Sequence, residues 1–451
     1  MTTADFSLPR LLGLGLSAML IPLGSTMIAV ALPSIASDLN RAPATLTQWL
    51  VNGYLLVNIV ALAPGGWLAD RWGHKKTLRL GQAVFAVGCV LPLMSHDFGV
   101  LVASRLLMAL GGALIIPTVM AVFKVSVPPQ MRHRVFGYFG AMMSFSAALG
   151  PSLGGVLVQG FGWLAIFFMN LPPLALSVWL SRGFFKAGAA SAPAAAATTA
   201  QRFDWRGALL MAAMLVCLVV GLKDQPLLLL PAALLLALFI ACERRTAQPL
   251  MDLRLFADRS FAAGCAIIAL QNLAMYALLF QLPFLLKLLY QWGPQQAGPF
   301  MTAFMVANML GAALGGRIAE RVGARATCVA GSLLSVAGLL GLSLVDAHVA
   351  PLLVAAALAI AGLGLGLAVG PSQGAAMAHV AHSASGIASG VLSTCRYLGG
   401  IVGVSILGLL LSSAASSADL ARHEQAILIF AASFFVAGLV SLRLPGRVSQ
   451  A

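Results

Sequence analysis

Long apolar runs alternate with short polar stretches along the whole chain. A helix of about 20 apolar residues, rising about 1.5 Å per residue, crosses the hydrocarbon core of a bilayer. The pattern therefore predicts an all-α polytopic membrane protein with fourteen transmembrane helices, the shortest being 207–222 and 226–241. The expected spans are 11–33, 47–69, 78–95, 99–122, 135–158, 163–181, 207–222, 226–241, 261–286, 298–318, 327–345, 350–371, 386–411 and 425–442.

A polar turn of eight residues occurs twice, 250 residues apart, each time between two apolar runs. The copies read GWLADRWG at 66–73 and GRIAERVG at 316–323, so four positions are identical and Asp70 is exchanged for Glu320. The duplication indicates a transporter built from two related halves. We expect a gating role for Gly66, Asp70, Arg71 and Gly73 in the first copy, and for Gly316, Glu320, Arg321 and Gly323 in the second.

The halves are expected as six-helix bundles at 1–182 and 258–451. Residues 183–257 would join them through an Ala-rich linker, Ala187–Ala200, and two extra transmembrane helices.

The positive charge is distributed unevenly over the predicted loops. Although the net charge is +14, 21 of the 27 Lys and Arg fall on the cytoplasmic side if the N-terminus is cytoplasmic. This asymmetry predicts both termini in the cytoplasm, in a plasma (inner) membrane, with lipids as partners and no nucleic acid. The six cysteines follow no metal-ligand spacing, and no nucleophile–base cluster occurs. We therefore expect no metal, cofactor or enzymatic activity.

A glycine-rich segment lies in the fifth predicted span and reads GPSLGG at 150–155. Gly150 and Gly154 share one helix face, so a neighbouring helix can approach closely. Pro151 removes a backbone donor and predicts a bend. Together with Gly155, these residues suit an element that rocks against a partner, although a plain packing interface is an alternative.

Two arginines lie inside apolar runs, where a charge requires a cavity or a partner. Arg396 is about 15 Å deep, and Arg105 is near enough to the external end to snorkel. The expected substrate cavity is lined by these two arginines and by Ser25, Thr26, Tyr54, Asn58, Asn272 and Tyr276. An alternative is that the polar side chains only bridge helices.

None of the thirteen Asp and Glu residues is near the expected bilayer midplane. A buried acid is the usual proton carrier, since desolvation raises its pKa toward the working range. Proton coupling would then run through Asp70 or through a proton on the substrate, or it does not exist. Unpaired arginines in low dielectric favour neutral or weakly anionic ligands over cations.

The turn at 66–76 resembles the cytoplasmic loop motif of the major facilitator superfamily, and 150–155 resembles the helix 5 motif of its antiporters, which is associated with export. The chain is most similar to the fourteen-helix drug:proton antiporters, also at Ala31–Pro33 and Arg396–Gly400. It departs from them at Gly24, where the family usually has an acid, at Ala29, where it has Asn, and at Met108, where it often has Gln.

This resemblance implies alternating access and proton-coupled export of small amphipathic molecules, as in multidrug or antibiotic efflux. Two alternatives stay open: a dedicated exporter of one neutral or anionic metabolite, and a membrane receptor or scaffold that does not transport.

Overall fold

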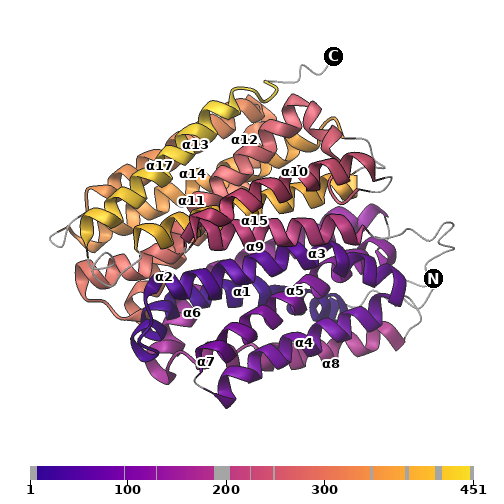
Figure 1. The fold of residues 1–451 in the computed structure, drawn as a ribbon, viewed down its shortest axis with the longest axis horizontal. Helices are drawn as coiled ribbons and strands as arrows, with labels where there is room; N and C mark the ends of the chain where they lie inside the picture. Colours follow the sequence, from indigo (N-terminus) through magenta and orange to yellow (C-terminus); the bar gives the residue numbers. More distant parts are fainter. Residues whose placement is uncertain are drawn as a thin grey trace.

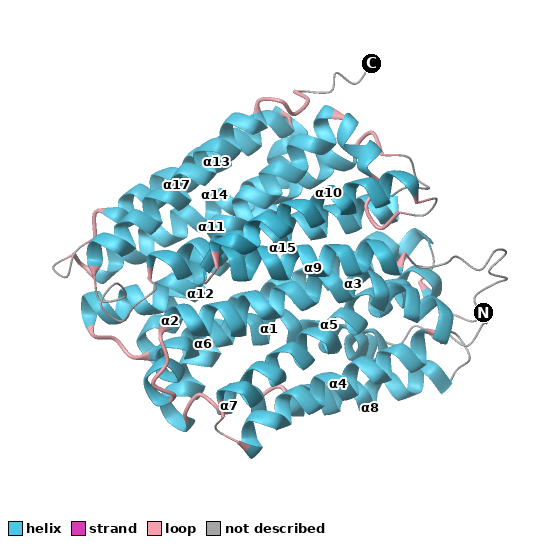
Figure 2. Cartoon of the chain, viewed as in Figure 1, coloured by secondary structure: helices cyan, strands magenta, loops and turns pink. Residues whose placement is uncertain are grey.

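The computed structural model describes residues 8–95, 97–127, 129–186, 204–223, 225–246, 249–345, 349–380, 385–411 and 419–446. Within these ranges the chain forms helices and short connections, without strands (Figure 2). The expected linker Ala187–Ala200 lies outside the described residues.

Each predicted span overlaps one or more helices. The first half holds α1 (Leu8–Asp38), α2 (Pro43–Leu46), the π-helical η2 (Thr47–Asn52), α3 (Gly53–Trp72), α4 (His74–Met94), α5 (Phe98–Ser126), α6 (Pro129–Phe161), α7 (Ala165–Phe168) and α8 (Leu171–Lys186). The inserted segment holds α9 (Trp205–Lys223), η3 (Pro226–Leu228), α10 (Leu229–Arg245) and η4 (Leu253–Ala257). The second half holds α11 (Arg259–Tyr290), α12 (Pro294–Val322), α13 (Ala324–Ser343), α14 (Pro351–Met377), α15 (Ser385–Leu410) and α17 (Leu420–Ser441).

The predicted count of fourteen spans is supported only in part. Among the described residues, eleven helices are long and apolar enough to cross a membrane, and α9 is a shorter apolar helix. The helices α8 and α10 have only 16 and 17 residues. The expected span 163–181 is interrupted, because the short α7 ends at Phe168 and α8 starts at Leu171, just before Pro172.

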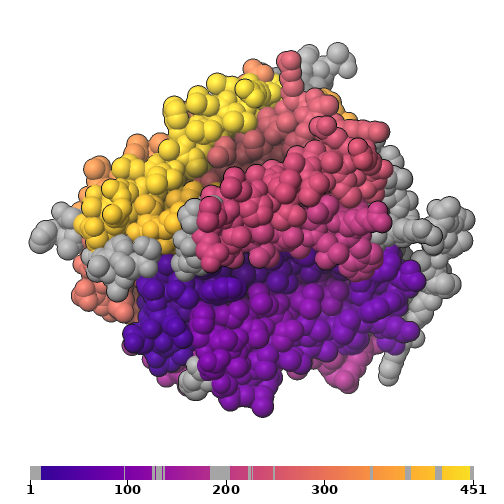
Figure 3. Space-filling view, viewed as in Figure 1, coloured from indigo at the N-terminus to yellow at the C-terminus, as the bar shows by residue number. Residues whose placement is uncertain are grey.

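The two halves lie side by side, with the first half and the second half on opposite sides of a common seam (Figure 1). The inserted helices α9 and α10 pack against each other, and α9 also contacts α3 of the first half and α15 of the second. In the space-filling view, the inserted segment covers the boundary between the halves on the visible face (Figure 3).

The duplicated turn has the same backbone shape in both halves. Gly73 ends α3 with φ 86°, and Gly323 ends α12 with φ 93°, a region that L-residues rarely adopt. The glycine contacts also repeat: a Cβ on Gly81 or Gly331 would press on a backbone carbonyl of α5 or α14. The repeat therefore extends beyond the turn into α4 and α13, and it supports the prediction of two related halves.

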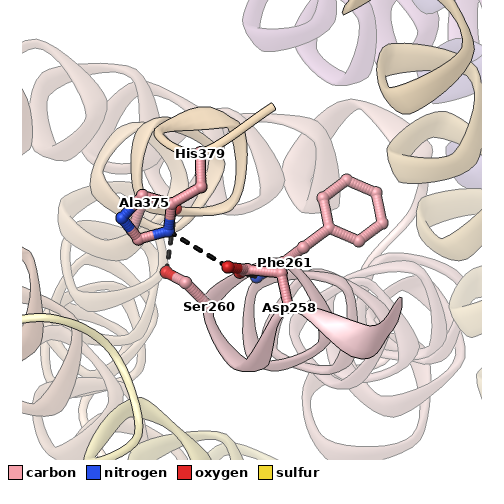
Figure 4. Close-up of polar contacts among 5 residues, drawn as sticks. All are labelled: Asp258, Ser260, Phe261, Ala375 and His379. Carbon is pink, nitrogen blue, oxygen red and sulfur yellow. Dashed lines mark hydrogen bonds and ion pairs between the residues drawn. The ribbon is translucent and has the colours of Figure 1, made fainter. Parts of the chain in front are cut away.

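The start of the second half is fixed by a cluster of polar contacts (Figure 4). One Asp258 oxygen accepts the Phe261 N–H at 2.8 Å and so caps α11, while the other lies 3.2 Å from His379 Nδ1. Ser260 Oγ donates to the Ala375 carbonyl at 2.9 Å. These contacts join the first turn of α11 to the end of α14.

Candidate substrate cavity

A cavity of about 290 Å³ lies between the two halves. Its walls come from α1 and α6 of the first half, and from α11, α12, α14 and α15 of the second. The lining residues are Pro22, Ser25, Thr26, Met143, Ser144, Ala147, Ile268, Gln271, Asn272, Met275, Tyr276, Leu279, Met305, Asn308, Met309, Leu365, Val369, Gln373 and Arg396.

The two halves contribute different chemistry to this cavity. The second half supplies all the amide groups and the guanidinium, which belong to Gln271, Asn272, Asn308, Gln373 and Arg396. The first half supplies only hydroxyls, those of Ser25, Thr26 and Ser144, besides apolar surface. Hydrogen-bond recognition of a ligand would therefore fall mainly to the second half.

Some of these polar groups are free to meet a ligand. The Gln271 side chain is 1% exposed, and its Nε2 has no hydrogen-bond partner among the described residues. Asn272 Nδ2 donates to the Ile268 carbonyl at 2.8 Å, which orients the amide along α11. No hydrogen bond or ion pair joins Arg396 to another residue that the structure describes. A buried amide without a partner is costly, so a bound ligand would relieve it.

Five of the eight predicted cavity residues line the cavity: Ser25, Thr26, Asn272, Tyr276 and Arg396. Sequence reasoning missed the amides of Gln271, Asn308 and Gln373, and four methionines, whose flexible side chains suit ligands of varied shape. The signal was available on α11 and α12, because Gln271, Met275 and Leu279 are spaced by four residues, as are Met305 and Met309.

Arg105 is not a cavity residue in this structure. Its side chain is 1% exposed, its Nε donates to the Leu50 carbonyl at 3.3 Å, and its guanidinium lies 4.3 Å from the centre of the Tyr54 ring. These contacts hold the arginine inside the first half instead of letting it snorkel. Tyr54 and Asn58, also expected in the cavity, are buried with it, and Asn58 Nδ2 donates to the Tyr54 carbonyl at 3.0 Å.

The position of the missing acid also faces the interior of the first half. A Cβ on Gly24 would lie 3.5 Å from the Met108 methyl and 3.8 Å from Asn170 Oδ1. Gly24 and Met108 are two of the places where the chain departs from the family it resembles, and the structure brings them into contact. The residues that line the cavity include no Asp or Glu.

The glycine motif of α6 faces two different helices. A Cβ on Gly150 would collide with Thr26, and one on Gly154 would lie 3.1 Å from Met27 Cα, both on α1 of the same half. Gly155 faces the Pro294 carbonyl of α12 in the other half.

The reverse contact is made by Gly298 of α12, since a Cβ there would lie 2.5 Å from the Pro151 carbonyl. Ser152 adds hydrogen bonds to Thr302 Oγ1, at 3.2 Å from its N–H and 2.7 Å from its Oγ. The motif is thus a packing interface on one side and part of the seam on the other.

The seam is closed at one end of the molecule. Besides the α6–α12 contact, Asn52 Nδ2 donates to Ser405 Oγ at 2.9 Å, which joins the start of α3 to α15 near its end. The duplicated turns lie at the opposite end, because they form the C-terminal ends of α3 and α12.

At that end the acids of the turns are exposed. Asp70 and Glu320 are open to solvent, and neither accepts a hydrogen bond from another described residue. An anion such as Asp70 would be stabilised by backbone N–H groups at a helix start, but the described residues form no such bond with it in this conformation. Arg71 instead lies over the Trp67 ring at 5.2 Å. The tightly packed glycine in each turn is the one before the predicted Gly66 or Gly316. A Cβ on Gly65 or Gly315 would lie 2.3 Å from a backbone carbonyl oxygen of α5 or α14, respectively.

Two helical halves around a central cavity define a membrane transporter and not an enzyme. The chain belongs to the Major Facilitator Superfamily, whose profile matches residues 14–404. It is 31% identical over 416 residues to the tetracenomycin C resistance and export protein of Streptomyces glaucescens, with 90% of this chain and 76% of that protein covered.

Two further comparisons agree. The methyl viologen resistance protein SmvA of Salmonella typhimurium is 29% identical over 411 residues, with 88% and 81% covered. In its fold, the chain is similar to an inward-facing, unoccupied bacterial homologue of the human lysosomal transporter Spinster, with a TM-score of 0.70, 15% identity and full coverage of both chains.

Proposed function

We propose that this protein exports small amphipathic molecules across the plasma membrane by alternating access, with both termini in the cytoplasm. The observation that carries the proposal is the central cavity between the two halves, which the α6–α12 and Asn52–Ser405 contacts close at one end. The positive residues near the turns favour a cytoplasmic position for the opposite end. The similarity to a protein named for tetracenomycin C export supports the outward direction.

The charge of the cavity favours neutral or weakly anionic substrates. Among the described residues that line it, Arg396 is the only charged one, and the amides around it both donate and accept hydrogen bonds. A cationic substrate would find no carboxylate to offset its desolvation. The proposed preference differs from what the name of one relative indicates, because methyl viologen, to which that protein confers resistance by its name, is a dication.

Proton coupling would not use a carboxylate in the cavity. A proton would enter the cycle through Asp70, which is free in this conformation, or on the substrate itself. In the first case, closure of the open end would bring Asp70 to N–H groups at a helix start of the other half, where the helix dipole favours an anion. The turn residues Gly66, Arg71, Gly73 and their second-half counterparts would then act as the gate at that end.

A dedicated exporter of one metabolite is the second candidate. The cavity volume of about 290 Å³ favours it, because it is at the lower limit for sites that enclose drug-sized ligands. A scaffold without transport is disfavoured by the central cavity between the two halves.

Flux into proteoliposomes tests these alternatives. The panel should pair neutral and weakly anionic compounds with a quaternary ammonium dye, with and without an imposed pH gradient. We expect accumulation of the first class, reduced by Arg396→Gln, while the matched control Arg443→Gln, outside the cavity, retains it. Strong transport of the dye by the unmodified protein would refute the charge preference, and a well-folded protein without any flux would refute export.

A further inference from the structure

Two carboxyl groups meet where the inserted helices α9 and α10 come together. Asp204 precedes α9 and caps it, since its Oδ1 accepts the Gly207 N–H at 2.9 Å. Glu243 lies near the end of α10, beyond the apolar run 226–241, and its Oε2 accepts the Met251 N–H at 2.9 Å. Each carboxyl group therefore uses one oxygen to hold backbone.

The remaining two oxygens lie beside the same backbone position, Gly207. A Cβ on Gly207 would lie 2.5 Å from Glu243 Oε1 and 2.6 Å from Asp204 Oδ2. The two oxygens are thus within about 5 Å of each other, a distance at which two like charges disfavour double ionisation. Both atoms are buried without a hydrogen-bond partner among the described residues, and the Glu243 side chain is only 3% exposed.

No described cation neutralises this pair. Arg244 and Arg254, with Asp252, line a hollow of about 380 Å³ beside Glu243, and Arg206 follows Asp204 on the exposed side of α9. None of them forms an ion pair with either carboxyl group in the described part of the chain. From α3, Arg71 lies over Trp67, which in turn contacts Trp205.

We propose that Asp204 and Glu243 form a proton-binding site that fastens the inserted helix pair to both halves of the transporter. With one proton bound, the pair carries a single negative charge, and a small approach of the side chains would let the O–H of one carboxyl group donate to the free oxygen of the other. Without it, two buried negative charges repel each other and the contact loosens. Burial, opposed by the Met251 N–H bond and reinforced by the charge of Asp204, raises the pKa of Glu243 to about 7, so the site would titrate near neutral pH.

The site is placed to affect the transport cycle. On one side, Trp205 packs edge-on against Trp67 of the duplicated turn, with ring centres 6.0 Å apart. On the other, Glu243 holds Met251, just before η4 and the capped start of α11. A proton here would set how firmly the segment between the halves is held, without being carried through the cavity.

Infrared difference spectroscopy of the full-length protein in lipid nanodiscs, between about pH 5 and pH 9, tests the site. We expect a protonated-carboxyl band that disappears near neutral pH in the unmodified protein. It should be absent in Glu243→Gln, shifted to lower pH in Asp204→Asn, and unchanged in the control Asp252→Asn, which alters a neighbouring cap. A band that survives Glu243→Gln, or no titration above about pH 6, would overturn the proposal.

Adding sodium or magnesium ions during the same infrared titration provides a second test. If adding either ion lowers the midpoint, the pair is a cation site and the proton assignment fails; an unchanged midpoint supports it. Asp204→Asn keeps the test decisive if Glu243→Gln does not insert.

Stability and flux give independent readouts. Since folding raises the pKa of Glu243 from 4.5 to about 7, the folded protein holds a proton that the unfolded chain has released, and stability falls as the pH rises through this range. The melting temperature of the unmodified protein should show this fall, and Glu243→Gln should flatten it. With equal pH on both sides, flux should lose its pH dependence in Glu243→Gln but persist. Absence of flux in the unmodified protein and in all variants would instead count against the proposed export, and the infrared band would still decide the proton site.

Discussion

The hydrogen bonds across the seam predict how the transporter divides its time between conformations. Replacing Thr302 by Val keeps the shape of the side chain but removes the hydroxyl that bonds both the N–H and the Oγ of Ser152. Each such bond contributes about 1 kcal/mol net to the state that contains it. Losing one or two of them should therefore shift the ratio of this state to the oppositely closed state by about 5- to 30-fold.

Pulsed EPR distances measure this shift, with spin labels at the ends of α6 and α12 on the closed side. The Thr302→Val distribution should gain a longer distance there at the expense of the short one. Thr118→Val is the matched control, because the Thr118 hydroxyl bonds only within its own helix, to the Leu114 carbonyl at 2.7 Å. A distribution that does not differ from that of the control would show that these bonds do not hold the seam.

Three further changes test other features of the structure. Gly155→Leu should stop flux while the protein still inserts, because the larger side chain separates α6 from α12. Gly154→Leu should instead lower thermal stability by about 1–3 kcal/mol, because the larger side chain overpacks the contact with α1. Equal effects of the two substitutions would contradict the assignment of the two glycines to different helix faces. Arg105→Ala should destabilise the first half by about 2–4 kcal/mol in thermal unfolding and leave the charge preference of the remaining flux unchanged, since Arg105 is outside the cavity. Gly24→Asp should lower the melting temperature by placing a carboxylate against Met108. Adding Met108→Gln should restore about 1 kcal/mol of the lost stability, because the glutamine amide can donate a hydrogen bond to that carboxylate. Strictly additive effects of the two substitutions would argue against contact between positions 24 and 108.

The fold was largely predictable because its signals are local. Each long apolar run is largely helical, and the duplicated turns at Gly73 and Gly323 share one backbone conformation. The interruption between α7 and α8 was missed, since apolar composition continues through 163–181 while the backbone turns before Pro172. Composition reports whether a segment is buried, but not whether it is one helix or two.

The site was only partly predictable, because the rotation of each helix depends on its neighbours. Helices buried on several sides show no clear polar face, so sequence alone did not tell that Ser25 faces the cavity while Gly24 faces Met108. Arg105 illustrates the same difficulty. A charge within an apolar run requires a partner, but the partner, the Tyr54 ring, is revealed only by the packing of α3 against α5.

The position of α9 has a consequence for how lipid-dissolved molecules reach the cavity. The contacts between the halves include two helix pairs, α3 with α15 and α6 with α12. α9 contacts both helices of the first pair and forms a second wall beside it, whereas α6 and α12 are joined directly through glycines. The two lateral routes from the bilayer are therefore unequal, and a molecule that partitions into the membrane meets one fewer helix on the α6–α12 side.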